Sequence, residues 1–274
     1  MGSPESLYLD LLAKSLTHTL YGGADAVGFT SPSRIRRKIF EILERRGIVP
    51  VRIIENQDRQ RAEGRINPLF AHTMVGIERL GNLRSCLETV LADNIPGDVI
   101  ETGVWRGGAS IFARGVLKAY GITDRTVWVA DSFKGLPEPD PRYPADAESL
   151  WHTADHLRVS LEAVQENFRS YDLLDDQVRF VEGWFRDTLP GLRDQTWSVI
   201  RLDGDMYEST MDALTNLYPG LSPGGFLIVD DFEIDMCRQA VEDFREANRI
   251  TEPIEHVDWT GVYWRRTPDV QSGP

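Results

Sequence analysis

The stretch that decides the fold is GDVIETGVWRGGASIFARGVLKAYG, residues 97–121. Residues 97–102 have the short apolar run of a buried strand, and residues 107–121 have the apolar spacing of an amphipathic helix. The connection begins with Glu101, Thr102 and Gly103. Strand packing requires neither the acid nor the glycine. Glycine permits a tight turn and a close approach of the backbone to another group, so we expect this loop to bind a ligand.

The alternation of strand and helix continues toward the C-terminus. Further strands are expected at residues 126–133, 177–184, 197–205 and 224–232, followed by a hairpin of residues 254–259 and 261–266. This pattern predicts an α/β fold with a mostly parallel, doubly wound sheet and one antiparallel strand. Ligands of such folds bind beyond the carboxyl ends of the strands, so the functional residues are expected there.

Composition and charge limit the classes of function. The chain has 274 residues and a formal charge of −13, from 43 acidic residues against 30 lysines and arginines. Such a surface repels phosphate backbones, so we expect no nucleic-acid partner. No apolar run approaches the roughly 20 residues that span a bilayer, and no signal peptide is recognisable, so we expect no membrane association. Two cysteines without metal-binding spacing, Cys86 and Cys237, suit a cytoplasmic protein.

Residues 1–73 differ in character from residues 74–274, which carry the α/β pattern. Helices are expected at residues 6–22 and 31–47, the second with Ser31 as its cap and Pro32 in its first turn. The polar stretch 51–69 is expected to be a loop or mobile lid. We therefore predict a helical N-terminal lid over a core of residues 74–274. His72, near the junction, is expected either to cap a helix or to form part of the roof of the site.

Each expected parallel strand ends in a carboxylate. These acids are Glu101, Asp131, Glu182, the pair Asp203 and Asp205, and the pair Asp230 and Asp231. The first loop reads E-T-G-x-x-x-G-G, which lacks the glycine spacing of a pyrophosphate site, and its acid would accept from an amino group rather than bind phosphate. Asp131, followed by Ser132, is placed to accept from two ribose hydroxyls. An amino acid and a ribose without phosphates fit S-adenosylmethionine; a structural turn and a helix cap are the simpler alternatives.

The last two parallel strands carry the second group of acids. Asp203, Asp230 and Asp231 would repel one another without a cation, and oxygen ligands select a hard ion such as Mg²⁺. We predict these three as metal ligands, with Asp205 free to act as a base. The alternative is that Asp205 and Asp231 cap the helices that follow them. Trp184 is expected either to pack on the fold or to contact an adenine ring.

With these residues identified, the chain resembles the macrocin O-methyltransferase family (TylF type), whose members methylate sugar hydroxyls of antibiotics. Matching stretches include AHTMVGIERLGNL at 71–83, RTVWVADSFKGLP at 125–137 and RLDGDMYESTMDALTNLYPGLSPGGFLIVDDF at 201–232. The resemblance covers residues 70–266. Residues 31–65 are most similar to the aminocoumarin branch, which includes the noviose 4-O-methyltransferase type of novobiocin biosynthesis (NovP type).

The resemblance implies a class I S-adenosylmethionine-dependent methyltransferase, Rossmann-like in fold, that uses Mg²⁺. It also implies a homodimer in which residues 1–73 serve as lid and dimerisation segment. It assigns Asp203, Asp230 and Asp231 to the metal and Asp205 to the general base. The residues that it assigns to S-adenosylmethionine are Glu101, Thr102, Gly103, Ser110, Asp131, Ser132, Gly183 and Trp184.

The expected reaction moves a methyl group from S-adenosylmethionine to a deoxysugar hydroxyl of an antibiotic glycoside, with the 4-hydroxyl of a noviosyl group as the best match. The alternative enzyme is a metal-dependent glycosyltransferase that uses Asp203, Gly204 and Asp205 as a D-x-D motif. That alternative explains the acids but leaves the loop at 101–108 and Asp131 without a role. A binding module without catalysis is a second alternative, and it would tolerate loss of the metal acids.

Overall fold

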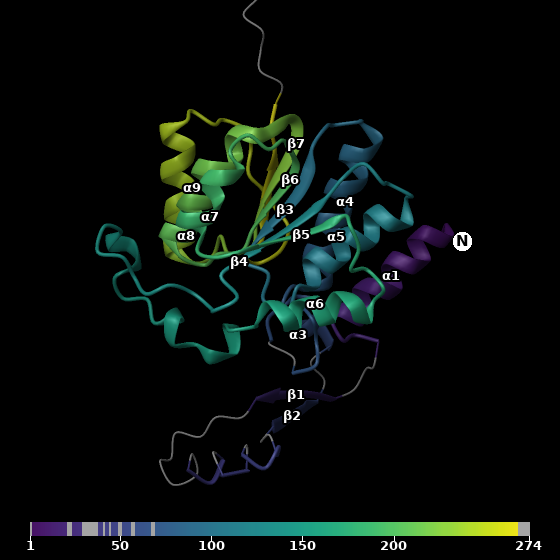
Figure 1. Cartoon of the computed structure of the whole chain (residues 1–274), viewed down its shortest axis with the longest axis vertical. Coiled ribbons are helices and arrows are strands. Elements are labelled where there is room, and N and C mark those ends of the chain that lie inside the picture. Colours follow the sequence, from purple (N-terminus) through teal and green to yellow (C-terminus); the bar gives the residue numbers. More distant parts are fainter. Residues whose placement is uncertain are drawn as a thin grey trace, which may run out of the picture.

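The structure is a computed structural model that describes residues 2–20, 24–28, 38–40, 42–43, 45–48, 51–55, 58–66 and 69–267 (Figure 1). The expected helix start at Ser31 and Pro32 lies outside these residues. Within the described part of the chain, no helix is long and apolar enough to cross a membrane.

The main sheet has seven strands in the order β5-β4-β3-β6-β7-β9-β8. They are β3 (Asp98–Thr102), β4 (Val127–Asp131), β5 (Val178–Glu182), β6 (Trp197–Leu202), β7 (Leu221–Val229), β8 (Glu255–His256) and β9 (Val262–Arg265). The strands from β3 to β7 pair in parallel, whereas β9 pairs antiparallel with both β7 and β8. The predicted parallel strands and the C-terminal hairpin are confirmed. The strand order reverses between β3 and β6, so the switch point of the fold lies there.

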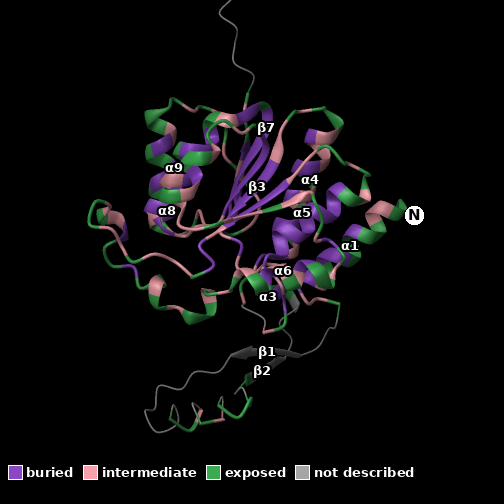
Figure 2. Cartoon of the chain, in the orientation of Figure 1, coloured by how far each residue is buried: buried purple, intermediate pink, exposed green. Residues whose placement is uncertain are grey.

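Two layers of helices cover the sheet (Figure 1). One layer contains α4 (Ile77–Ala92), α5 (Gly108–Ala119) and α6 (Leu161–Ser170), and the other contains α7 (Phe185–Thr188), α8 (Tyr207–Leu217) and α9 (Asp235–Ala247). Side chains alternate between the faces of a strand. Val99 of β3 therefore packs under α4 and α5, whereas its neighbour Ile100 packs under α8 and α9. Figure 2 shows the central strands buried between these layers.

The N-terminal helix α1 (Pro4–Leu16) belongs to the layer of α4 and α5. Ser3 caps its first turn by accepting from the backbone N–H of Ser6. Its Leu12 packs so closely on α5 that a Cβ atom at Gly115 would lie 2.4 Å from Leu12 Cδ2. The helix ends six residues earlier than the expected end at residue 22, and His18 just beyond it has a left-handed φ of 57°.

The expectation of an irregular loop at residues 51–69 is wrong. Residues Val51–Glu55 form β2, which pairs antiparallel with β1 (Ala24–Gly28), and α3 (Asp58–Ala62) follows. This two-stranded sheet lies apart from the main sheet (Figure 1). The β-branched residues Val51, Ile53 and Ile54 favour a strand, but their partner strand is distant in the sequence, so the local polar pattern concealed the pairing.

Candidate active site

A cavity of about 300 Å³ opens beyond the carboxyl ends of β3, β4, β6 and β7. Further lining residues come from other segments: Gly64, residues 73–75, 135–137 and 184–186, Trp151, His156, Leu157, Trp259 and Thr260. The sequence-predicted site residues that line it are Glu101, Gly103, Asp131, Ser132, Trp184, Asp203, Asp205, Asp230 and Asp231. Thr102 and Ser110 are buried next to the wall without lining it, and Gly183 precedes the lining residue Trp184.

The loops after β3 and β6 touch through their backbones. Gly103 has a left-handed φ of 84°, and a Cβ atom there would lie 1.7 Å from the carbonyl oxygen of Asp203. The backbone N–H of Asp203 in turn donates to the carbonyl of Thr102 at 2.8 Å. Only glycine fits this contact, so Gly103 brings the loop of Glu101 against the loop of Asp203 and Asp205.

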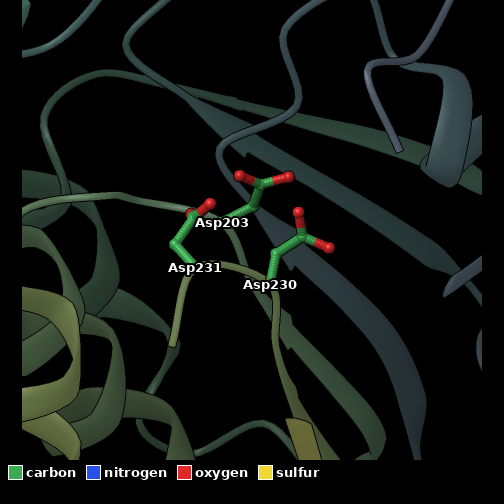
Figure 3. Close-up of side chains that lie close together, drawn as sticks. All are labelled: Asp203, Asp230 and Asp231. Carbon is green, nitrogen blue, oxygen red and sulfur yellow. The ribbon is translucent and has the colours of Figure 1, made fainter. Parts of the chain in front are cut away.

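Three aspartates that line the cavity lie close together (Figure 3). Asp203 follows β6, and Asp230 and Asp231 follow β7; each offers a carboxylate oxygen, and these oxygens all lie within 4.8 Å of one another. Among the described residues this is the one group of three or more potential metal ligands. Asp231 Oδ2 is buried and has no hydrogen-bond partner in that part of the chain.

Two buried arginines contact this group. Arg201 of β6 donates from Nη1 to Glu101 Oε1 at 2.5 Å and to Asp203 Oδ2 at 2.8 Å, and from Nη2 to Asp230 Oδ1. Arg79 of α4 donates to Asp230 Oδ2 and pairs with Asp258 at 3.0 Å. Arg201 therefore connects Glu101, near the end of β3, with two of the three converging aspartates.

The two guanidinium groups leave negative charge uncompensated. Burial raises the pKa of Asp231 well above its usual range, and Asp205, Asp203 and Asp230 add to this shift. Burial likewise raises the pKa of Asp205 to about 7, with Asp203 and Asp230 as further causes. Asp205 lines the cavity beside Asp203 and has a left-handed φ of 56°.

This donor set fits a hard divalent cation. The converging atoms are carboxylate oxygens, the ligands that Mg²⁺ and Ca²⁺ select. Asp231 Oδ2 has no other partner, and each oxygen of Asp230 keeps a second lone pair beside its arginine.

The loops after β3 and β4 form the other side of the cavity. Ser110 at the start of α5 donates to Glu101 Oε2, and burial raises the pKa of Glu101 to about 7 while Arg201 opposes the shift. Asp131 accepts the backbone N–H of Val104 at 2.8 Å and that of Phe133 at 2.7 Å. Burial raises the pKa of Asp131, and these backbone donors act against it. Asp131 thus joins the loop after β3 to the loop after β4 through these hydrogen bonds.

The capping alternative for the acids is not observed. The residues that precede α8 and α9 at the cap position are Met206 and Ile234, and neither makes a side-chain cap. Asp146, from the 3₁₀ turn η1 (Pro144–Asp146), instead accepts the backbone N–H groups of Tyr207 and Glu208 at 2.7 and 2.9 Å. Neither Asp205 nor Asp231 therefore caps the helix that follows it.

His72 does not line the cavity. Its Nδ1 lies 2.8 Å from the hydroxyl of Tyr171, and its carbonyl accepts the backbone N–H of Gly108 at the start of α5. The next residues, Thr73 to Val75, do line the cavity. His72 therefore anchors the segment that carries the wall.

Comparison with known proteins decides the family. The sequence model of the macrocin O-methyltransferase (TylF) family matches residues 5–266 of this chain. The chain belongs to the macrocin O-methyltransferase (TylF) family. It is therefore an S-adenosylmethionine-dependent O-methyltransferase with the class I fold. The glycosyltransferase alternative and the non-catalytic alternative lose their support.

Two curated proteins are similar to this chain over nearly its whole length. The 8-demethyl-8-(2,3-dimethoxy-alpha-L-rhamnosyl)-tetracenomycin-C 4'-O-methyltransferase of Streptomyces olivaceus is 51% identical over 263 residues, which cover 95% of this chain and 93% of the relative. The demethyldecarbamoylnovobiocin O-methyltransferase of Streptomyces niveus is 47% identical over 269 residues, 97% of this chain and 95% of the relative. The solved structure of the O-methyltransferase NovP is 45% identical, with a TM-score of 0.83 over 96% of this chain and 100% of that chain. The resemblance to the NovP type is confirmed.

Sequence reasoning missed several residues of this TylF-family site. Arg201 was visible as a lone charge in the apolar strand WSVIRL, residues 197–202. Arg79 and Trp259 reach the cavity only through the tertiary fold. Glu208 and Asp212 lie one helical turn apart on α8, and both line the cavity.

Proposed function

We propose that the enzyme is a Mg²⁺-dependent sugar O-methyltransferase that methylates a deoxysugar hydroxyl of an antibiotic glycoside, the 4-hydroxyl of a noviosyl-type sugar. The observation that carries this proposal is the convergence of Asp203, Asp230 and Asp231 on the cavity of a TylF-family protein. The names of the relatives support the acceptor class, because one acts on a rhamnosyl tetracenomycin and one on demethyldecarbamoylnovobiocin.

Asp203, Asp230 and Asp231 would hold the metal. When bound, Mg²⁺ lowers the pKa of a hydroxyl that it contacts. Arg201 and Arg79 hold Asp230 in place through both of its oxygens. Rigid placement of these ligands orients the acceptor, which is a large part of the rate gain in a displacement reaction.

Asp205 is proposed as the general base. Its carboxylate lines the cavity two residues after Asp203 and is not used to cap α8. S-adenosylmethionine supplies the electrophilic methyl group. The carboxylate of Asp205 would accept the proton of the acceptor hydroxyl as the oxygen bonds to the methyl carbon, the sulfur–methyl bond breaks and S-adenosylhomocysteine leaves.

The loops after β3, β4 and β5 are proposed to hold the cofactor. Glu101 would accept from its amino group, and Asp131 from its ribose hydroxyls, since both lie on the cavity wall. Gly103, Ser132 and Trp184 line the same side. Thr102, Ser110 and Gly183 do not line the cavity and would position the residues that do, as Ser110 does by donating to Glu101.

Residues 1–73 are proposed as lid and dimerisation segment over the core of residues 74–274. Trp259 Nε1 donates to the carbonyl of Glu63 at 2.9 Å, and Arg106 Nη1 donates to the carbonyls of Leu69 and Ala71. These contacts join Glu63, Leu69 and Ala71 to the core, and Trp259 lines the cavity, which supports the lid assignment. Leu7 and Leu11 of α1 are 61% and 56% exposed, an apolar face suited to a second copy, which sedimentation analysis of a Leu7→Glu/Leu11→Glu variant would test.

A cytoplasmic location is proposed for the enzyme. Both cysteines, Cys86 and Cys237, are buried free thiols, as expected in a reducing compartment.

Mass spectrometry with a labelled methyl donor tests the proposed reaction. The two acceptors are demethyldecarbamoylnovobiocin and the dimethoxyrhamnosyl tetracenomycin, each incubated with and without a chelator. We expect one labelled methyl group on the sugar, lost in chelator and restored by Mg²⁺. Transfer that continues unchanged in chelator would refute the metal, and no transfer to either glycoside would refute the acceptor class.

A further inference from the structure

Glu208, in the first turn of α8, has one carboxylate oxygen without a partner. The side chain is 3% exposed and lines the cavity. Its Oε1 pairs with Arg186 Nη1 at 3.2 Å, whereas Oε2 is buried and has no hydrogen-bond partner among the residues that the structure describes. Buried carboxylate oxygens are nearly always hydrogen-bonded in native proteins, so this one calls for a partner.

The backbone of α8 does not need this carboxylate. An acid in the first helical turn commonly accepts the free N–H groups of that turn. Here Asp146 accepts the N–H groups of Tyr207 and Glu208, so these N–H groups do not need the Glu208 carboxylate as an acceptor. Asp146 also fixes the start of the helix, and with it the direction in which Glu208 projects.

The surroundings specify the chemistry of the missing partner. Asp212 lies one turn further along α8 and lines the same cavity. On this wall two carboxylates, Glu208 and Asp212, accompany one arginine, Arg186, whose Nη1 already pairs with Glu208 Oε1. Burial and Glu208 raise the pKa of Asp212 to about 6, while Arg186 and Arg142 oppose the shift. An anion would be repelled, and a hydrogen-bond donor is needed. Glu208 follows Asp205 by three residues, on the wall where the acceptor must approach.

We infer that Glu208 Oε2 accepts a hydrogen bond from a second hydroxyl of the acceptor sugar, not the hydroxyl that is methylated. Glu208 is then a specificity residue that sets how the sugar ring is turned before Asp205 and the metal ligands. This inference rests on the proposed function, because it requires a polyhydroxylated acceptor in the cavity.

The test compares Glu208→Ala, Glu208→Gln and Arg186→Ala with demethyldecarbamoylnovobiocin as the acceptor, because the 2,3-dimethoxyrhamnosyl sugar of the other glycoside has no free hydroxyl besides the one that is methylated. Efficient methylation of that second glycoside alone would count against the inference. A hydrogen bond to a charged group predicts that Glu208→Ala raises the acceptor KM about tenfold or more. Glu208→Gln keeps an oxygen acceptor and should lose less. Arg186→Ala removes the ion pair but keeps the Glu208 carboxylate, so it is the control for a purely structural role of that pair. The affinity of each variant for S-adenosylhomocysteine, measured by calorimetry, should equal that of the wild type.

Acceptor analogues give a readout that does not depend on stable variants. Each sugar hydroxyl other than the methylated one is replaced in turn by hydrogen, and one such analogue should bind the wild type about tenfold more weakly. Glu208→Ala should not distinguish that analogue from the parent glycoside. Equal effects of Glu208→Ala and Arg186→Ala, or no penalty with any analogue, would overturn the inference. Failure of the proposed function itself is recognised separately, because the wild type would then methylate neither glycoside.

Discussion

Arg201 of β6 donates to Glu101 of β3 at 2.5 Å, across the switch point of the sheet and over 100 positions of sequence. The same Nη1 atom contacts Asp203 at 2.8 Å. One guanidinium thus joins the loop expected to bind the cofactor to the acids expected to bind the metal. The same buried positive charge therefore contacts a proposed cofactor ligand and a proposed metal ligand.

Replacing Arg201 with Met should leave buried carboxylates uncompensated and lower the free energy of unfolding by about 3–5 kcal/mol. Added Mg²⁺ should restore part of the melting temperature, because a cation at the aspartates replaces some of the lost charge. The matched control is Arg114→Met. Arg114 is a buried arginine outside the cavity lining, and its Nη2 lies 2.7 Å from Asp175 Oδ2. Mg²⁺ should not rescue that control, and equal rescue of both variants would contradict the metal site.

Gly103→Ala should impair cofactor binding. The new Cβ atom would meet the carbonyl of Asp203 at 1.7 Å, so the β3 and β6 loops must separate. We expect the affinity for S-adenosylhomocysteine to fall about tenfold or more by calorimetry. Gly121→Ala is the control, because Gly121 has a similar φ of 66° and nothing within 4 Å of a new Cβ atom. It should cost about 1 kcal/mol of stability and leave the affinity unchanged; an equal loss in both variants would indicate strain alone.

Asp146→Ala should remove the cap of α8 and lower the free energy of unfolding by about 1–2 kcal/mol in urea titrations. It should also raise the acceptor KM, because α8 carries Glu208. Ser160→Ala removes the cap of α6, where Ser160 accepts the N–H of Ala163 at 3.3 Å. That control should lose stability without a change in KM. An unchanged KM in Asp146→Ala would show that the start of α8 does not orient the acceptor.

Asp212 should make stability depend on pH. Its pKa is raised to about 6, first by burial and then by Glu208, while Arg186 and Arg142 oppose the shift. A folded-state pKa above the unfolded one stabilises the fold at low pH, and that contribution is lost as the pH rises through about 6. We therefore expect the stability of Asp212→Asn, relative to that of the wild type, to be higher at pH 7.5 than at pH 5. Melting temperatures of both proteins at the two pH values measure this difference. The same difference at both pH values would contradict the shift.

The sheet and the position of the site could be read from the sequence for a physical reason. Parallel strands bring their carboxyl ends to one edge, so acids at successive strand ends predict their own meeting point. The cluster of Asp203, Asp230 and Asp231 follows from that rule alone.

Other residues depend on contacts that no local pattern encodes. Asp146 caps a helix 61 residues away, and Arg79 reaches Asp230 across 151 positions. The partner of β2 is likewise distant, so the sequence around Val51–Glu55 does not show which segment it pairs with. Charged residues inside apolar segments, such as Arg201, are the one local sign that such contacts exist.

The central claim is that Asp203, Asp230 and Asp231 bind a divalent cation in the cavity. An anomalous difference map from crystals grown with Mn²⁺ and S-adenosylhomocysteine tests it most directly. The account predicts one strong peak within about 2.0–2.3 Å of an oxygen from each of the three aspartates. A map with no peak there, with Asp203 and Asp230 bound only by Arg201 and Arg79, would contradict it.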